Sequence, residues 1–284
     1  MTVLVTGAAG NVGRIVVERL LAAGESVRAL TRNPRTAFPP GVAVVTGDLV
    51  EPATLEHAFD GADRLYLFPV PATARAVVER ARRAGVRRVV VLSSGAVTGG
   101  YDTDFHLPVE RAVEESGLEW THVRPGEFAL NKLWLWGPSI RAERVVRDPF
   151  PEAAWYPTHE RDIADVAVAA LLEEGHTGVA YDVSGPEMIA NRDQVRAIAA
   201  AIGQEIRHER ITREQAREQY LRQGGFAAAN AEFLLGYADY SGDPVAEPGE
   251  PPPAPKPPTC EPVTGRPGRT FAQWARDHAG DFRP

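Results

Sequence analysis

Three glycines near the start of the chain, Gly7, Gly10 and Gly13, have a spacing that suits phosphate binding. They follow an uncharged run of β-branched and apolar residues, Thr2 to Thr6, and precede an amphipathic segment. Glycine permits a tight turn at the first position, leaves room for a pyrophosphate at the second, and lets a helix pack closely on a sheet at the third. Because a helix N-terminus also attracts phosphate, the pattern predicts a nucleotide site rather than a plain strand–turn–helix corner. We assign to it Gly7, Ala9, Gly10, Asn11, Val12 and Gly13.

The end of the next predicted strand, Ser26 to Thr31, bears on which nucleotide binds. Folds that prefer NAD place an acidic residue about 20 residues after the glycines, where it binds the ribose 2′-hydroxyl. This chain has Thr31 and Arg32 at that place, with no acid nearby. Arginine can pair with a 2′-phosphate through charge-assisted hydrogen bonds, so we expect NADP(H), bound by Arg32 and Asn33. The alternative is that Arg32 is a solvated turn residue.

Alternating strands and helices must position these residues. We predict strands at 2–6, 26–31, 42–46, 63–68 and 87–92, with helices at 15–23 and 73–84. This alternation predicts an α/β, Rossmann-like fold with a doubly wound parallel sheet, whose ligands bind at the carboxyl ends of the strands. The residues just beyond those ends therefore belong to one cofactor cleft: Gly10, Arg32, Asp48, Leu49, Phe68, Pro69, Val70, Ser93 and Ser94.

The second half of the chain predicts a smaller α/β C-terminal lobe. We place the NADP-binding domain at 1–150, with part of 155–185 returning to it, and the lobe at 185–284. A short apolar helix at 127–136 carries residues that could line a substrate pocket or form the core of the lobe: Phe128, Asn131 and Trp134. Further elements are predicted as helices at 104–116, 158–174, 192–202, 213–223, 226–237 and 271–278, and strands at 118–124, 178–184 and 205–210.

The segment 241–262 is dense in proline and acidic residues. Such a composition predicts a loop or polyproline segment that serves as an extended surface tether, with docking of a partner as the alternative.

Composition narrows the class of protein. The net charge of −7 and the lack of a basic tract argue against nucleic acid as the main partner. Cys260 is the single cysteine, which excludes an intramolecular disulfide and fits a reducing cytoplasm. No second histidine follows His159 and Glu160 at metalloprotease spacing, so we expect no metal. We find no signal peptide before the first strand and no apolar run near the ~20 residues of a membrane span, so we expect a cytoplasmic protein.

The sequence resembles the NmrA-like group of atypical short-chain dehydrogenase/reductases, which includes quinone and phenylcoumaran reductases and inactive regulators. Four segments carry the resemblance: Val5 to Gly13, Leu30 to Pro34, Gly47 to Leu49, and Glu114 to Gly126. The resemblance implies that Asp48 lies near the adenine amino group. Asp48 could equally cap a helix that starts near Glu51 and Pro52.

The resemblance also implies where catalytic groups should stand. Short-chain reductases use a tyrosine as the acid, a lysine four residues later, and a serine at the end of the fifth strand. Ser93 and Ser94 fill the serine place, but no Tyr-x-x-x-Lys follows. His106 stands at the lysine place and Asp102 at the tyrosine place. Because imidazole titrates near neutral pH, His106 could donate a proton or bind a substrate oxygen; the alternative is a helix-surface or cap residue.

Hydride transfer itself needs no side-chain nucleophile, only a nicotinamide and an acceptor held in position. The missing tyrosine and lysine argue against simple ketone reduction but not against reduction of a quinone or an activated enone. We therefore expect an NADPH-dependent oxidoreductase that acts on a quinone-like, aromatic or conjugated carbonyl small molecule, and that could form a homodimer. One alternative is a non-catalytic NADP(H)-sensing redox regulator that binds a protein partner. A third is an epimerase, dehydratase or isomerase.

Overall fold

The computed structural model describes residues 1–240, 242–245 and 257–284. Contacts divide the chain into two compact units. Unit 1 comprises Met1–Pro125, Glu160–Val183 and Cys260–Arg266, and unit 2 comprises Gly126–His159, Ser184–Thr259 and Pro267–Pro284. The domain limits that we infer from the sequence, 1–150 and 185–284, stay a proposal.

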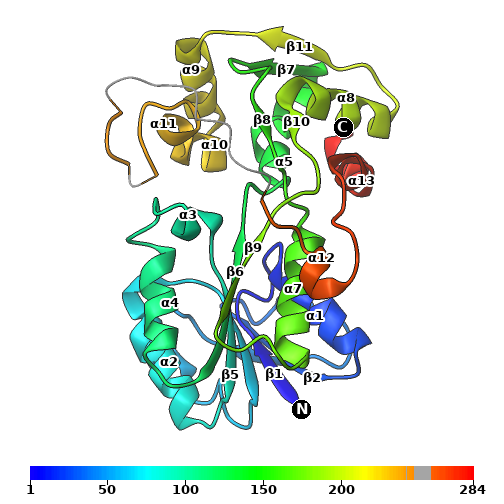
Figure 1. Cartoon of the computed structure of the whole chain (residues 1–284). Helices are drawn as coiled ribbons and strands as arrows, with labels where there is room; N and C mark the ends of the chain where they lie inside the picture. Colours follow the sequence, from blue (N-terminus) through cyan, green and yellow to red (C-terminus); the bar gives the residue numbers. More distant parts are fainter. Residues whose placement is uncertain (241, 246–256) are drawn as a thin grey trace. The chain divides into compact units, whose positions relative to one another are not determined.

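Unit 1 is built on a seven-stranded parallel sheet, which confirms the predicted Rossmann-like fold class (Figure 1). The strand order β3-β2-β1-β4-β5-β6-β9 reverses direction between β1 and β4, and such a switch point is where a ligand crevice forms. The strands are β1 Thr2–Val5, β2 Ser26–Thr31, β3 Ala43–Thr46, β4 Arg64–Leu67, β5 Arg88–Leu92, β6 Glu119–Pro125 and β9 Val179–Val183.

Helices cover both faces of this sheet. In Figure 1, α1 and α7 lie side by side on one face, and α2 and α4 lie on the other. Strands that are buried on both faces carry continuous apolar runs, which explains the run Val89 to Leu92 in β5. The helical elements of unit 1 are α1 Gly13–Ala22, η1 Pro52–Leu55, η2 Pro71–Thr73, α2 Ala74–Arg83, α3 Gly95–Thr98, α4 His106–Glu114, α7 Glu160–Leu172 and α12 Glu261–Thr264.

Unit 2 packs helices with two small sheets around an aromatic core. The sheet β10-β8 is antiparallel and β11-β7 is parallel. Trp136, Ile198, Tyr220, Phe271 and Trp274 belong to its buried cluster. Its elements are α5 Asn131–Leu135, α6 Gly137–Glu143, β7 Val145–Asp148, β8 Ala154–Trp155, β10 Ile189–Ala190, α8 Asn191–Ile202, β11 Arg207–Arg210, α9 Arg213–Gln223, α10 Gly225–Ala229, α11 Ala231–Leu234, α13 Phe271–Asp277 and η3 Ala279–Phe282.

Two predicted helices of unit 2 are shorter than expected, and each has a local cause. The helix predicted at 127–136 covers only α5, because Glu127 and Ala129 pair their backbones with Thr158 instead, at 2.6 and 3.0 Å. The helix predicted at 226–237 breaks at Asn230, whose side-chain amide donates to the carbonyl of Phe226 at 2.8 Å. A short polar side chain of this kind competes with the helical hydrogen bonds.

Most of the proline-rich segment lies outside the described residues, which omit residue 241 and residues 246–256. Our expectation of an extended tether concerns this part. The end of the segment departs from it, since Glu261–Thr264 form the short helix α12.

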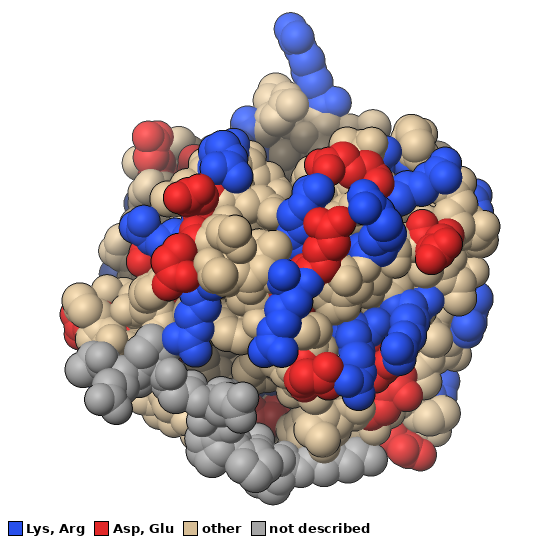
Figure 2. Space-filling view, turned by 90° about the horizontal axis from the view of Figure 1, so that it is seen from above, with Lys and Arg blue, Asp and Glu red and all other residues tan. Residues whose placement is uncertain are grey.

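Charged side chains of both signs are interspersed over the face seen in Figure 2, and neither sign forms a continuous patch there. Among the described residues, no helix has the length and apolarity that crossing a bilayer requires.

Candidate functional site

The turn between β1 and α1 requires glycine at two positions. Gly7 has φ +58°, and a Cβ there would lie 3.0 Å from the Cβ of Phe68. A Cβ on Gly13 would lie 2.2 Å from the carbonyl oxygen of Gly7, far inside van der Waals contact. Gly10 closes the turn, because its N–H donates to the same oxygen at 2.8 Å. The carbonyl oxygen of Gly7 thus accepts the hydrogen bond that closes the turn, and its position leaves no room for a side chain at residue 13.

The N-terminus of α1 presents free backbone donors. The N–H groups of Asn11, Val12 and Gly13 have no acceptor within the residues that the structure covers, and Val12, at the N-cap, provides no side-chain cap. Gly10 and Asn11 are exposed, and the first turn of the helix carries no acidic side chain. Unpaired amides and the positive end of the helix dipole favour an anion. The turn therefore fits the pyrophosphate of a dinucleotide.

Thr6 joins the two strands on either side of the switch point. Its hydroxyl donates to the carbonyl of Tyr66 at 2.9 Å and accepts from the backbone N–H of Phe68 at 2.7 Å. This bond places Phe68, which is 43% exposed, directly over Gly7.

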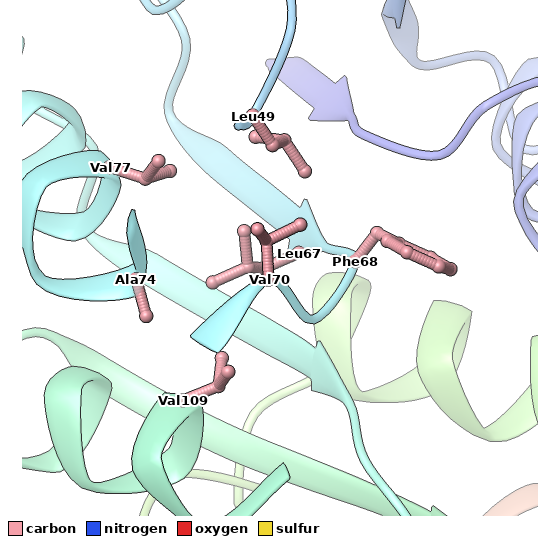
Figure 3. A pocket seen from close by; sticks show the side chains of 7 residues that line it. All are labelled: Leu49, Leu67, Phe68, Val70, Ala74, Val77 and Val109. Atoms are coloured by element: carbon pink, nitrogen blue, oxygen red, sulfur yellow. The ribbon is translucent and has the colours of Figure 1, made fainter. Parts of the chain in front are cut away.

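Three of the predicted cofactor residues, Leu49, Phe68 and Val70, line one apolar pocket (Figure 3). Leu49 and Val70 point into it, whereas the ring of Phe68 is directed away from the other side chains. Most side chains of the pocket are buried and the space between them does not admit a water molecule, so they form apolar packing beneath the carboxyl ends of the strands, with Phe68 exposed at its edge. The lining residues are Leu49, Leu67, Phe68, Val70, Ala74, Val77 and Val109. Pro69 lies buried between Phe68 and Val70.

The predicted 2′-phosphate residue follows β2 directly. Arg32 is exposed, and its guanidinium has no hydrogen bond or ion pair in the described part of the chain. Asn33 instead shapes the turn, because its side-chain oxygen accepts from the N–H of Arg35 at 3.0 Å. Arg32 is therefore available to an external anion.

Asp48 lies in the turn after β3. Its carboxylate accepts from the N–H of Val50 at 2.9 Å, whereas the helix η1 has Glu51 at its N-cap and no side-chain cap. Asp48 thus does not provide the cap for η1 that the sequence offered as one interpretation. The other interpretation, a contact with adenine, stays a prediction.

Ser93, which stands at the place of the family's catalytic serine, belongs to a buried polar network. Its hydroxyl donates to Glu110 at 2.5 Å, and Arg124 donates to both oxygens of the same carboxylate at 2.9 and 2.6 Å. Although burial raises the pKa of Glu110, the hydrogen bonds from Arg124 and Ser93 bring it below its usual range. Ser94 caps α3, because its hydroxyl accepts from the N–H of Ala96. The catalytic role of Ser93 stays a prediction.

His106 begins α4 and pairs with Asp102. The distance from Nδ1 of His106 to Oδ2 of Asp102 is 2.5 Å. Asp102 is almost completely buried, whereas the ring of His106 remains 16% exposed. The Asp-x-x-x-His spacing occupies the places of the family's tyrosine and lysine in the sequence, and a role for Asp102 becomes apparent only from this contact.

One group of three possible metal ligands occurs among the described residues: Glu110, Glu114 and His122. The two oxygens of Glu110 already face Arg124 and Ser93, and His122 lies 3.1 Å from Glu114. We interpret the group as a hydrogen-bonded cluster beside the ion pair of Glu110 with Arg124.

The three predicted substrate residues lie in unit 2. Phe128 is half-buried against the core of that unit, and Asn131 is the first residue of α5. Trp134 is 37% exposed, and its ring lies 5.1 Å from that of Phe226. Phe128 thus contributes to the core of the unit, and a substrate contact of these residues stays a prediction.

Comparison with known proteins agrees with the geometry of the glycine turn. Residues 7–174 match the family model described as NAD(P)H-binding. The chain is 38% identical over 291 residues to (4-alkanoyl-5-oxo-2,5-dihydrofuran-3-yl)methyl phosphate reductase of Streptomyces griseus, with 99% of both chains covered. It is 34% identical over 304 residues to the NAD(P)H azoreductase of Xenophilus azovorans, again with 99% of both covered.

Among solved structures, the negative transcriptional regulator NmrA in complex with NADP aligns with a TM-score of 0.70 at 17% identity, covering 97% of this chain and 94% of that one. This similarity confirms the NmrA-like fold that the sequence predicts. The cofactor is NAD(P)H, and the relatives are reductases. The chain belongs to the NAD(P)H-binding family, as an oxidoreductase with the NmrA-like, atypical short-chain dehydrogenase/reductase fold.

Proposed function

We propose that the protein uses NADPH to reduce a small molecule with a conjugated, electron-poor double bond. The observation that carries the proposal is the pair of relatives that match over the whole chain. The name of the first describes a furanone whose ring double bond is conjugated to carbonyl groups, and the name of the second describes reduction of an azo bond. Both acceptors can take up a hydride without the tyrosine and lysine that ketone reduction uses.

Different residues of unit 1 bind different parts of the cofactor. The N–H groups at the start of α1 bind the pyrophosphate, and Arg32 binds the 2′-phosphate that distinguishes NADPH from NADH. Leu49, Phe68 and Val70 supply apolar surface to the rings. NADPH, when bound, supplies the hydride, and the chain supplies position and a proton.

We assign the proton to His106 and the recognition of the acceptor to Phe128, Asn131 and Trp134. His106 fits because its ring is partly exposed and lies on a helix that follows β5. Trp134 fits because its exposed ring, paired with Phe226, offers a flat surface to a conjugated substrate.

The test is NADPH oxidation by the full-length protein against a panel of acceptors. The panel contains menadione, an acyl butenolide, an azo dye and cyclohexenone, with cyclohexanone as the matched unconjugated ketone. We expect turnover of at least one conjugated acceptor and none of cyclohexanone. NADPH binding without any turnover would instead favour the redox-sensing regulator, and turnover of cyclohexanone alone would overturn the proposed acceptor class.

We also propose a cytoplasmic, homodimeric enzyme whose partners are small molecules. The single cysteine is compatible with a reducing compartment. Light scattering after size exclusion gives the mass in solution, and a mass near 30.8 kDa, that of one chain, would contradict the dimer.

A further inference from the structure

We propose that Asp102 is a positioning residue that holds His106 in one tautomer and leaves its Nε2 atom to exchange a proton with the substrate. The chemical part of this inference rests on the proposed reductase function. The tautomer itself can be measured without any substrate, so that the two can fail separately.

The carboxylate of Asp102 uses its two oxygens for two different tasks. Oδ1 accepts from the backbone N–H groups of Phe105 and His106 at 3.0 and 2.9 Å, at the start of α4. Oδ2 faces Nδ1 of the His106 ring at 2.5 Å. The contacts of Oδ1 are those of a helix cap. The contact of Oδ2 with the His106 ring adds nothing to capping.

Both residues of the pair are held in place. The backbone N–H of Asp102 donates to the carbonyl of Ala96 at 3.2 Å, which ties the loop to the short helix after β5. The ring of Phe105 meets the His106 ring edge to face, at 4.8 Å between centroids. Because Asp102 and Phe105 both contact the His106 ring, the ring has little freedom to rotate, and its Nε2 atom keeps one direction.

The charge state of Asp102 decides which nitrogen carries the proton. Although burial raises its pKa, the hydrogen bonds from the His106 ring and from the two backbone N–H groups bring the pKa below its usual range. An ionised carboxylate can only accept hydrogen bonds, so Nδ1 must be the donor in the contact with Oδ2. Nε2 has no hydrogen bond in the described part of the chain and is therefore the nitrogen that meets a ligand.

This arrangement suits a proton donor for a reduced conjugated acceptor. After hydride addition to the carbon β to the carbonyl, the electron pair of the double bond lies on the substrate's oxygen as an enolate. The protonated ring then gives its Nε2 proton to that oxygen, so the N–H bond breaks as the O–H bond forms. The ring is left neutral with its remaining proton on Nδ1, where Asp102 holds it, and the solvent returns a proton to Nε2. The enol takes a proton from water at its α carbon and loses its O–H proton, which gives the saturated carbonyl compound.

Replacement of Asp102 by asparagine separates the two tasks. The amide oxygen can still accept from the two backbone N–H groups, so the start of α4 is preserved. The amide nitrogen then faces Nδ1 and donates to it, which forces the neutral ring into the opposite tautomer. A purely structural cap would tolerate this change, and a positioning residue would not.

The first readout is the tautomer of His106 in the full chain, measured by nitrogen-15 nuclear magnetic resonance of the imidazole ring with and without NADP⁺. At a pH where the ring is neutral, we expect its proton on Nδ1 in the unmodified protein and on Nε2 in Asp102→Asn. The Nε2–H tautomer in the unmodified protein, or an unchanged tautomer in the variant, would overturn the proposal even if the protein is an active reductase.

The second readout is steady-state kinetics with an acceptor that the panel identifies. Asp102→Asn and His106→Gln should each lower kcat about 100-fold, with the KM for NADPH within about twofold. The double variant should be no slower than either single variant, because Asp102 acts through His106. Asp104→Asn, an exposed carboxylate in the same loop, is the matched control and should leave kcat unchanged. An unchanged kcat in Asp102→Asn, or additive losses in the double variant, would contradict the positioning role.

Discussion

The turn between β1 and α1 and the loop between α3 and α4 prepare unit 1 for chemistry in opposite ways. In the turn, binding of the cofactor depends on glycines, because a Cβ on Gly13 would overlap the carbonyl of Gly7. In the loop, the proposed proton transfer depends on two side chains in contact, the carboxylate of Asp102 and the ring of His106. Backbone donors suit a phosphate that many enzymes share, whereas a side-chain pair can be adapted to one acceptor. We therefore expect damage to the turn to abolish cofactor binding, and damage to the loop to slow the reaction.

The largest effect is expected at the third glycine of the turn. Gly13→Ala places a Cβ 2.2 Å from the Gly7 oxygen, so α1 must move away from the turn that it completes. We expect a loss of NADPH affinity of more than 100-fold, or a loss of stability of more than about 3 kcal/mol. Fluorescence titration and thermal unfolding measure the two.

Gly280→Ala is the matched control for that substitution, because a Cβ at Gly280 meets no atom within 4 Å. Equal behaviour of the two variants would mean that the turn does not need a glycine at this place, and the contrast with the loop would disappear.

A smaller effect on NADPH affinity is expected from reversing the charge of Arg32 at the end of β2. Arg32→Asp should weaken NADPH about 30-fold, or about 2 kcal/mol, since the 2′-phosphate then meets a like charge. Binding of NADH should change little. Calorimetric titration of both cofactors gives the ratio. Arg35→Asp makes the same charge change three residues later at another exposed position; an equal effect there would reduce the role of Arg32 to general electrostatic attraction.

The smallest effect concerns the scaffold behind the loop. The pKa of Glu110 lies below its usual range although burial raises it, because Arg124 and Ser93 donate to its carboxylate. Such a group stabilises the fold above the pKa of the unfolded chain and loses this contribution as pH falls through the lower, folded pKa. Glu110→Gln should therefore cost about 1–2 kcal/mol at neutral pH, and the difference from the unmodified protein should shrink as the pH falls below the usual range of a glutamate carboxyl group.

Urea unfolding at a series of pH values measures this difference. Glu115→Gln removes an exposed partner of Arg75 and is the control, for which we expect less than about 1 kcal/mol at every pH. A difference for Glu110→Gln that is constant with pH would show that its carboxylate is not the source of the stability.

The contrast between the two regions also explains what could be predicted from the sequence. Gly7 and Gly13 were recognisable because backbone geometry allows almost no other residue there, and Arg32 because no acid stands at the end of β2. The hydrogen bonds of Ser93 with Glu110, and of Asp102 with His106, depend on side-chain directions. The Asp-x-x-x-His spacing brings the second pair near each other, but it does not say which atoms meet.

The helix predicted at 127–136 failed for a related reason. Its apolar periodicity was genuine, but the backbone of Glu127 and Ala129 pairs with Thr158, about 30 residues further along the chain. Local patterns do not report such long-range pairing.

The central claim is that the protein transfers a hydride from NADPH to the β carbon of a conjugated acceptor. Its most direct test uses NADPH in which deuterium replaces both hydrogens at C4 of the nicotinamide ring, together with an acyl butenolide or cyclohexenone. We predict one deuterium at the carbon β to the carbonyl of the product, and a proton from water at the α carbon. Deuterium on the carbonyl carbon, or a product without deuterium, would contradict the account.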